Sequence, residues 1–86
     1  MRVIRLDDFE RALKRLPAET VARCEVQLTI LEENCQDVRL HTKKLRGTSV
    51  EIFSFRIGRN YRGLFYFDND DNIVVFDIGN RKDIYR

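Results

Sequence analysis

The sequence predicts an α+β fold: an N-terminal strand, a helix hairpin and a three-stranded antiparallel meander, with the helices packed on one face of the sheet. Three observations predict this class. β-forming residues open the chain, apolar residues then recur at a helical period, and three strand-forming segments separated by turn residues close it. A chain of 86 residues can bury only a small core, so we expect one domain covering residues 1–86.

The first half of the chain carries the first strand and both helices. Residues 2–6 are rich in β-formers and are expected to form an edge strand. Asp7 and Glu10 have the spacing of a capping box, and Pro17 ends the short helix and suits the first turn of the next. Each helix has one apolar stripe, which indicates a hairpin lying on a sheet. The stripes are Phe9, Ala12, Leu13 and Leu16, then Val21, Cys24, Leu28, Leu31 and Cys35.

The second half alternates between turn formers and strand formers. Residues 36–49 lack a sustained period and should form a connection that Leu40 and Leu45 hold to the core. Glycine and asparagine mark the first following turn, and clustered aspartate and asparagine mark the second. Consecutive hairpins of this kind make a meander. Its strands are expected over 50–57, 61–68 and 72–78.

Alternation along these strands separates aromatic residues from arginines. One face of the first strand carries Phe53, Phe55 and Ile57, and the opposite face carries Arg56. Arg62 likewise falls opposite the more aromatic set of the next strand. The helices should cover the aromatic face and leave the arginines open. In the last strand the core-facing residues are expected to be Val74, Phe76 and Ile78.

The formal net charge of +2 hides a local basic patch. Residues 39–62 contain one carboxylate, Glu51, among many cations. Such a patch favours a polyanionic partner, and nucleic acid fits better than a membrane because no amphipathic basic helix accompanies it. The alternative is a solvated basic surface. The cations are Arg39, Lys43, Lys44, Arg46, Arg56, Arg59 and Arg62.

Several kinds of chemistry are not expected. Cys24 and Cys35 would be roughly 16 Å apart on one helix, too far for a disulfide, so we expect buried thiols. His41 does not combine with either cysteine at a metal-binding spacing, so we expect neither a metal nor a cofactor. The amino terminus turns acidic before any apolar segment develops, which predicts a cytoplasmic protein without membrane association. An enzyme built on this chain would depend on arginine and tyrosine.

Three segments carry a family resemblance. They read HTKKLRG at 41–47, FSFRIGRNYRGLFYF at 53–67 and VVFDIGNRKDIY at 74–85. In content and order they resemble the K-L-x-G, Y-x-L-R-x-G-x-Y-R-x-x-Y and V-x-x-I-G-H-R-x-x-x-Y segments of the RelE/ParE superfamily of type II toxin–antitoxin toxins. The resemblance covers nearly the whole chain and implies the RelE-like order β-α-α-β-β-β. Two positions depart from the pattern: Ser54 stands where some members have lysine, and Asn80 replaces a frequent histidine.

The resemblance to the RelE branch implies a ribosome-dependent endoribonuclease, or mRNA interferase, which cleaves mRNA in the A site with the substrate's 2′-hydroxyl as nucleophile and so inhibits translation. By matching position, Arg62 and Arg81 would hold the scissile phosphate and stabilise the transition state. Arg56 would favour the phenolate of Tyr85, the proton acceptor, whose ordinary pKa is near 10. The expected catalytic residues are thus Arg56, Arg62, Arg81 and Tyr85, and the expected RNA-binding residues are Lys43, Lys44, Arg46 and Arg59.

The resemblance also implies partners and leaves alternatives open. The partners would be a cognate antitoxin protein, the ribosome with its rRNA, and mRNA. One alternative function is a ParE-like DNA gyrase inhibitor without nuclease activity, and another is an inactive relative that only binds. At single positions, Arg56 could instead pair with Glu51 or Asp77, Arg81 could be a turn residue, and Tyr85 could pack on the sheet edge.

Overall fold

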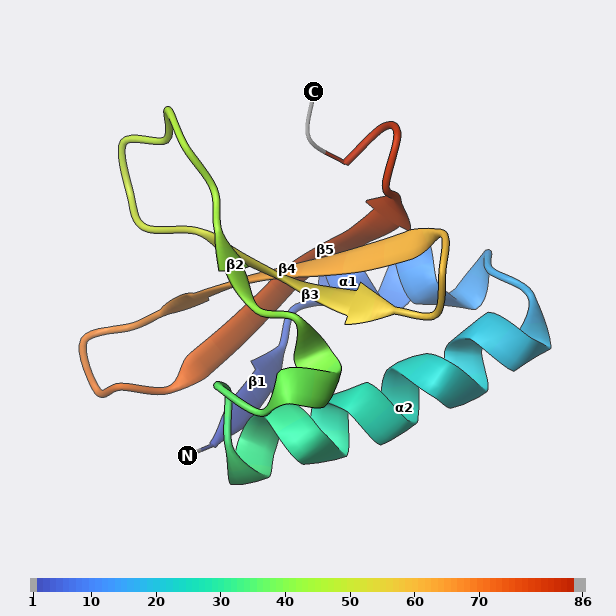
Figure 1. The fold of residues 1–86 in the computed structure, drawn as a ribbon, viewed down its shortest axis with the longest axis horizontal. Helices are drawn as coiled ribbons and strands as arrows, with labels where there is room; N and C mark the ends of the chain where they lie inside the picture. The colour runs from blue at the N-terminus through green and yellow to red at the C-terminus, as the bar shows by residue number, and fades with distance from the viewer. Residues whose placement is uncertain (1, 85–86) are drawn as a thin grey trace.

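The structure, a computed structural model, describes residues 2–84 and confirms the α+β class (Figure 1). One five-stranded sheet has the order β1-β5-β4-β3-β2, in which β1 runs parallel to β5 and the other neighbours are antiparallel. The N-terminal strand is therefore an edge strand, as expected. The elements are β1 (Val3–Arg5), α1 (Asp7–Lys14), α2 (Ala18–Glu33), the 3₁₀ turn η1 (Val38–Leu40), β2 (Lys43–Lys44), β3 (Phe53–Ile57), β4 (Tyr61–Phe67) and β5 (Ile73–Asn80).

The meander differs from the prediction mainly at its ends. β3 begins at Phe53, and the preceding loop is held by the Leu45 N–H, which donates to the Ile52 carbonyl at 2.8 Å. The connection after α2 contains the unexpected strand β2, whose two residues pair with the start of β3. The β3–β4 turn needs Gly58, which has a φ of +62°.

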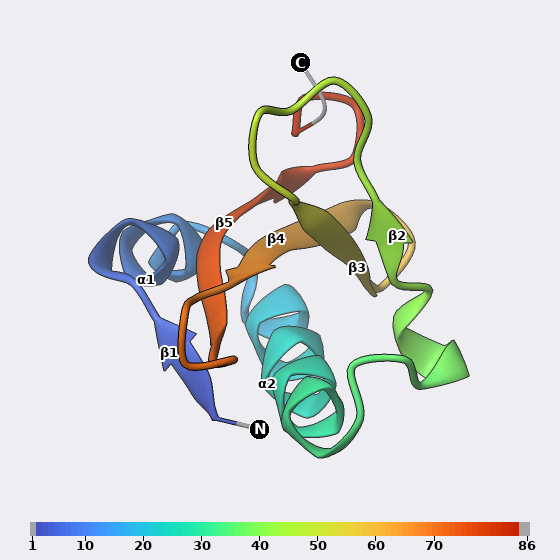
Figure 2. The same ribbon diagram turned by 90° about the vertical axis from the view of Figure 1, so that its left-hand side faces the viewer.

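The core lies between the sheet and the two helices. α1 packs against β5 and α2 packs against β3 and β1, so both helices cover one face. The loop between β2 and β3 and the tail after β5 lie on the other side of the sheet from α2 (Figure 2). We call this second side, which carries Arg56 and Arg62, the open face. The core cluster is Phe9, Leu13, Cys24, Leu28, Ile30, Leu31, Leu40, Phe55, Ile57, Phe65, Ile73, Val75 and Ile78.

A bulge in the β4–β5 ladder corrects the predicted core face of the last strand. Leu64 pairs with Asp77, but Phe65 pairs with Val75, so Phe76 is an extra residue in β5. In the part of β5 before the bulge, the side of the strand that faces the core is therefore the side that carries Val75. The Phe76 ring lies 5.6 Å from the ring of Tyr66, outside the core cluster. The residues of β5 in the core cluster are Ile73, Val75 and Ile78. Val74 is buried but lies outside that cluster, on the opposite side of the strand from Val75, so the predicted core face was wrong for Val74 and Phe76.

The start of α1 shows that the predicted capping box is also wrong. The N-cap is Leu6, and no side chain caps the helix. Glu10 instead binds Arg5, whose Nε donates to the Glu10 Oε1 atom at 2.6 Å. Arg5 also donates to both carboxylate oxygens of Glu25, each at 2.8 Å, and its guanidinium lies 5.6 Å from the centre of the Phe9 ring. This cluster ties β1 to both helices.

The two cysteines are free thiols. Cys24 is buried, and burial raises the pKa of its thiol to about 12, which makes it unreactive at neutral pH. Cys35 follows the end of α2 and packs against the core while half-buried. Across residues 2–84, no group of histidine, cysteine and carboxylate side chains could hold a metal ion, and neither helix is long and apolar enough to cross a membrane.

Candidate functional site

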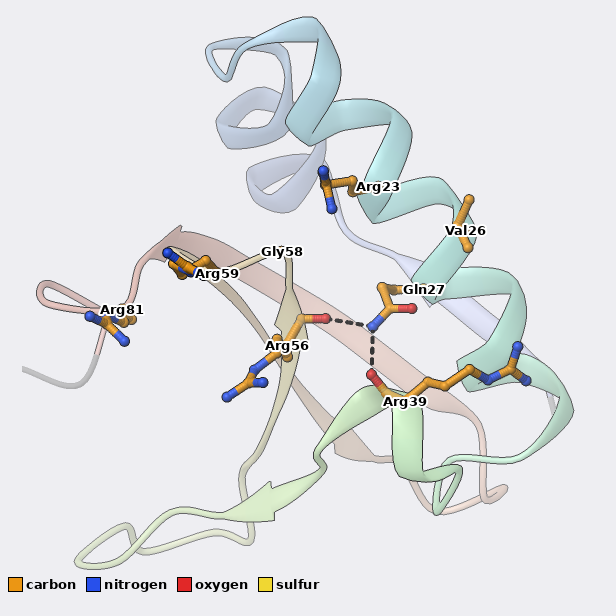
Figure 3. A pocket seen from close by; sticks show the side chains of 8 residues that line it. All are labelled: Arg23, Val26, Gln27, Arg39, Arg56, Gly58, Arg59 and Arg81. Carbon is orange, nitrogen blue, oxygen red and sulfur yellow. Dashed lines mark hydrogen bonds between the residues drawn. The ribbon is translucent and has the colours of Figure 1, made fainter.

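A cationic cleft lies between α2 and the end of β3. It has a volume of about 680 Å³ and an exposed apolar wall residue, Val26. Five of its eight lining residues are arginines, so its charge is far above that of the chain as a whole. Figure 3 shows the side chains that line it. They are Arg23, Val26, Gln27, Arg39, Arg56, Gly58, Arg59 and Arg81.

Two of the cleft arginines have carboxylate partners. Arg23 donates to Glu19 at 3.0 Å along α2. Arg39 binds Asp37 at 2.9 Å, and this guanidinium lowers the pKa of the Asp37 carboxyl to about 2. Figure 3 shows the Arg39 side chain extending away from the other cleft arginines. These two cations are therefore largely compensated within the fold.

The other three cleft arginines have no such compensation. Arg56, Arg59 and Arg81 are exposed, and within residues 2–84 none of them forms an ion pair. Their positions are fixed by backbone: the Arg81 N–H donates to the Asn60 carbonyl at 2.8 Å, which holds the tail against the β3–β4 turn. Three uncompensated guanidinium groups in one cleft create a field that favours an anion with several oxygens.

Arg62 is a neighbour of this group but does not line the cleft. It stands directly opposite Arg56 in the β3–β4 register, so both side chains rise from the open face. Its Nη1 atom donates to the carbonyls of Tyr61 at 2.7 Å and Arg59 at 3.4 Å. Arg62 therefore stabilises the turn that contains Arg59, and it lies next to Arg56 in the register.

The two carboxylates considered as partners for Arg56 are engaged elsewhere. Glu51 accepts from the Lys44 Nζ atom at 2.8 Å. The Asp77 Oδ1 atom accepts from the backbone N–H of Ile78 at 2.8 Å. The contact found at the Arg56 guanidinium is with His41 instead, at 3.5 Å from Nη1 to Nε2.

The predicted RNA-binding residues divide between two places. Arg59 belongs to the cleft, whereas Lys43, Lys44 and Arg46 line a separate groove of about 610 Å³ on the open face. Leu45 lines this groove and is not a member of the core cluster, which corrects its predicted role. The remaining lining residues are Thr48, Ile52, Leu64, Phe76 and Ile84.

Tyr85 and Ser54 are the remaining positions of the predicted site. Tyr85 lies outside the described residues. Ser54, which stands where some relatives have lysine, is buried, and Lys43 lies directly opposite it in the β2–β3 register. A cation is therefore present beside this position, although it comes from β2.

The sequence did not single out Gln27, which links three elements of the site. Its Nε2 atom donates to the Arg39 carbonyl at 3.0 Å and to the Arg56 carbonyl at 2.8 Å. Figure 3 shows both bonds. A single glutamine within a helical segment carries no signal of this kind, because both of its acceptors are backbone atoms that lie far away in the chain.

Comparison with known proteins gives matches in structure alone. No family model and no curated protein matches the chain. The archaeal RelE-RelB complex from Pyrococcus horikoshii OT3 has a chain with 25% identity and a TM-score of 0.77, covering 95% of this chain and 96% of that one. The toxin–antitoxin complex RelBE2 from Mycobacterium tuberculosis gives 26% identity, a TM-score of 0.69, and coverage of 93% and 96%. The YoeB/ParE toxin from Agrobacterium tumefaciens has 13% identity and a TM-score of 0.77, covering 94% of this chain and 99% of that one.

These likenesses span nearly the whole of each chain, so they concern the complete arrangement of helices and sheet rather than one motif. The protein is a small α+β domain with the fold of the RelE-like toxins. The resemblance to the RelE/ParE superfamily of type II toxins is thereby confirmed, and the neighbours are RelE and YoeB toxins.

Proposed function

We propose that this chain is the toxin of a type II toxin–antitoxin pair and that it cleaves mRNA on the ribosome by 2′-hydroxyl attack. The observation that carries the proposal is the group of three uncompensated arginines, Arg56, Arg59 and Arg81, in one cleft of a RelE-like fold. A phosphodiester gains negative charge as it reaches the pentacoordinate transition state. Guanidinium groups fixed beforehand around it stabilise that charge without further reorganisation.

The residues divide the work by position. Arg56 and Arg81 bind the scissile phosphate, and Arg59 holds the strand at the rim. Arg62 keeps the turn in place through its backbone bonds and adds charge beside Arg56. Tyr85 remains the proton acceptor that the family resemblance implies.

Dependence on the ribosome follows from the same chemistry. Arginines stabilise charge but transfer protons poorly, so such a site gains greatly when the substrate is held in line for attack. The cations Lys43, Lys44 and Arg46 in the separate groove on the open face suit rRNA phosphates. The site of action would be the cytoplasm.

A cognate antitoxin is part of the proposal. Two of the structural neighbours are complexes of a toxin with its antitoxin. The open-face groove has an apolar floor that includes Leu64 and Phe76 and a cationic rim that includes Lys43 and Arg46. These features suit an acidic, amphipathic segment of a small antitoxin protein.

The test is expression of the chain in cells without any antitoxin, followed by primer extension on their mRNA. The wild type should arrest growth and produce cuts at codon-proximal positions, whereas Arg56→Ala/Arg81→Ala should do neither. Arg11→Ala/Lys14→Ala is the matched control, because it removes two exposed cations from α1, away from the cleft. Circular dichroism and thermal melts confirm that each variant is folded.

The outcomes separate the alternative functions. A folded and fully toxic Arg56→Ala/Arg81→Ala protein would contradict the proposal. Filamentation and DNA damage without mRNA cuts would support a gyrase inhibitor of the ParE type. Harmless expression of the wild type would support a relative that only binds.

A further inference from the structure

His41 is the one imidazole of the chain, and the fold places it against a cleft arginine. It is exposed, it caps the end of η1, and its backbone is left-handed with a φ of 48° and a ψ of 46°. Side chains other than glycine adopt this conformation rarely, and histidine is among the more tolerant. The Nε2 atom of His41 lies 3.5 Å from the Nη1 atom of Arg56.

The contact is supported by hydrogen bonds on both of its sides. The Gln27 side chain bridges the carbonyl of Arg39, two residues before His41, and the carbonyl of Arg56 itself. The Asp37 carboxylate accepts from the Arg39 N–H at 2.9 Å and caps η1. η1 also packs against α2 and β3. His41 is therefore held beside the cleft by three elements rather than by its own loop alone.

The contact between the two groups fits one tautomer of the imidazole better than the other. A guanidinium has donors only, so a hydrogen bond to it requires an Nε2 atom that carries a lone pair, with the ring proton on Nδ1. A doubly protonated ring would place a second positive charge against Arg56. In that tautomer the Nε2 lone pair lies beside the Arg56 guanidinium, where a phosphate bound to Arg56 would also lie.

We propose that His41 is a catalytic proton-transfer residue of this cleft. The inference rests on the proposed function and changes one assignment in it, because His41 takes the role of proton acceptor that the family resemblance gives to Tyr85. The His41 Nε2 atom takes the proton of the substrate's 2′-hydroxyl as the 2′-oxygen–phosphorus bond forms. The bond from phosphorus to the 5′-oxygen breaks, and that oxygen keeps the electron pair and takes a proton from water. The products are a 2′,3′-cyclic phosphate and a 5′-hydroxyl, and the imidazolium returns its proton to solvent.

Charged groups face His41 from its own segment and from the elements packed against it. Arg56 faces it from β3, and Lys43 follows it in β2. Arg39 and Asp37 of its own segment pair with each other, and Glu33 from α2 acts on Arg39. The nearest of these groups is the Arg56 guanidinium. If His41 is the base, cleavage falls on the acid side of the pH profile, because only an imidazole with a free lone pair accepts a proton.

The experiment is single-turnover cleavage of ribosome-bound mRNA between pH 5 and 8. His41→Asn, which keeps a polar side chain tolerant of a left-handed backbone, should cleave about 100-fold more slowly and lose the acid limb of the profile. His41→Gly suits the same backbone, and added imidazole should restore at least a tenth of its activity. A role limited to folding would predict neither the changed profile nor the rescue. Wild-type rate and profile in His41→Asn would overturn the inference while leaving the proposed function intact.

A second measurement does not depend on cleavage. Long-range ¹H–¹⁵N spectra of the free protein at pH 7.5 should show His41 with its proton on Nδ1, and Arg56→Ala should remove that preference. A ring protonated at Nε2 would overturn the inference, because the nitrogen that contacts Arg56 would then have no lone pair. Absence of cleavage by the wild type would overturn the proposed function and this step with it, whatever the tautomer.

Discussion

Arg5 and Arg56 carry the same side chain in opposite surroundings. The Arg5 side chain is 31% exposed, binds two carboxylates and lies over an aromatic ring. Its partners raise its pKa, and it lowers the pKa of Glu25. Arg56 is exposed, contacts an imidazole and stands opposite another arginine in the β3–β4 register. Arg5, which holds β1 to the helices, is thus surrounded by carboxylates. Arg56, which lines the cleft, has no carboxylate partner within residues 2–84.

The same contrast separates the two faces of the sheet. The helix-covered face is a closed aromatic layer in which the Phe53 and Phe65 rings stack at 5.4 Å and Phe65 is fully buried. The open face combines like charges with an apolar groove. Neighbouring cations and exposed apolar side chains contribute little to the stability of the fold. We therefore attribute their presence on the open face to binding.

The strongest way to break the comparison is to give Arg56 a carboxylate like those of Arg5. Arg62→Glu places one directly opposite Arg56 in the register. Cleavage should fall at least 100-fold, because the new ion pair neutralises a phosphate-binding group and the carboxylate repels the substrate. Stability should change by less than about 1 kcal/mol, since a like-charge pair is removed while the bonds to the turn are lost.

Single-turnover kinetics and urea unfolding measure the two effects. Arg62→Gln is the control, because it removes the same cation without adding a carboxylate, and its loss of cleavage should be at least tenfold smaller. Equal losses of cleavage in Arg62→Glu and Arg62→Gln would mean that only the loss of the Arg62 cation matters. A carboxylate placed opposite Arg56 would then have no effect of its own.

The second prediction concerns Arg5, the arginine that is paired with carboxylates. Arg5→Met keeps much of the apolar stem over Phe9 but loses the bonds to Glu10 and Glu25. The free energy of unfolding should drop by about 1–2 kcal/mol, a value reduced by the exposure of both carboxylates. Cleavage per folded molecule should be unchanged. If Arg5→Met leaves the urea midpoint where it was, the cluster at β1 does not stabilise the fold.

The pH dependence of stability gives a smaller effect. Arg5 depresses the pKa of Glu25, so the Glu25 carboxylate contributes stability that is fully present above its unfolded pKa of about 4.3 and is lost as the pH falls through the lower folded value. Urea titrations between pH 3 and 7 should therefore show a shallower loss of stability in Glu25→Gln than in the wild type below about pH 4.5. Parallel curves would show that Arg5 does not favour the ionised form of Glu25.

The sequence predicted the fold because its signals are local and periodic. The stripes containing Phe9 and Leu28 and the alternation around Phe55 each identify an element and its buried side. The bulge at Phe76 has no such signal, because it arises from how β5 aligns with β4 beyond Leu64. Strand β2 is two residues long, too short for any period.

For the candidate site, the sequence identified residues but not their arrangement. Arg56, Arg59 and Arg81 were singled out by family position or by charge, and the structure brings them to one cleft. Arg62 was expected beside them, yet its guanidinium turns to backbone carbonyls. From the sequence, His41 was considered only as a metal ligand, and its contact with Arg56 spans 15 positions and depends on where η1 lies.

The smallest expected effect comes from an arginine that belongs to both sides of the comparison. Arg23 lines the cleft, but it is paired with Glu19 one helical turn away. If compensation rather than position decides which cations bind the substrate, Arg23→Ala should change cleavage less than about threefold. Its stability should fall by no more than about 0.5 kcal/mol, the usual value for an exposed helical pair.

Glu19→Ala makes the same comparison in the opposite direction, because it leaves Arg23 in place and removes its partner. The released guanidinium should then strengthen binding of an RNA oligonucleotide by about twofold and steepen its dependence on salt. Fluorescence anisotropy between 50 and 200 mM salt measures both quantities. A large loss of cleavage in Arg23→Ala, together with no gain in Glu19→Ala, would show that location in the cleft matters more than the presence of a carboxylate.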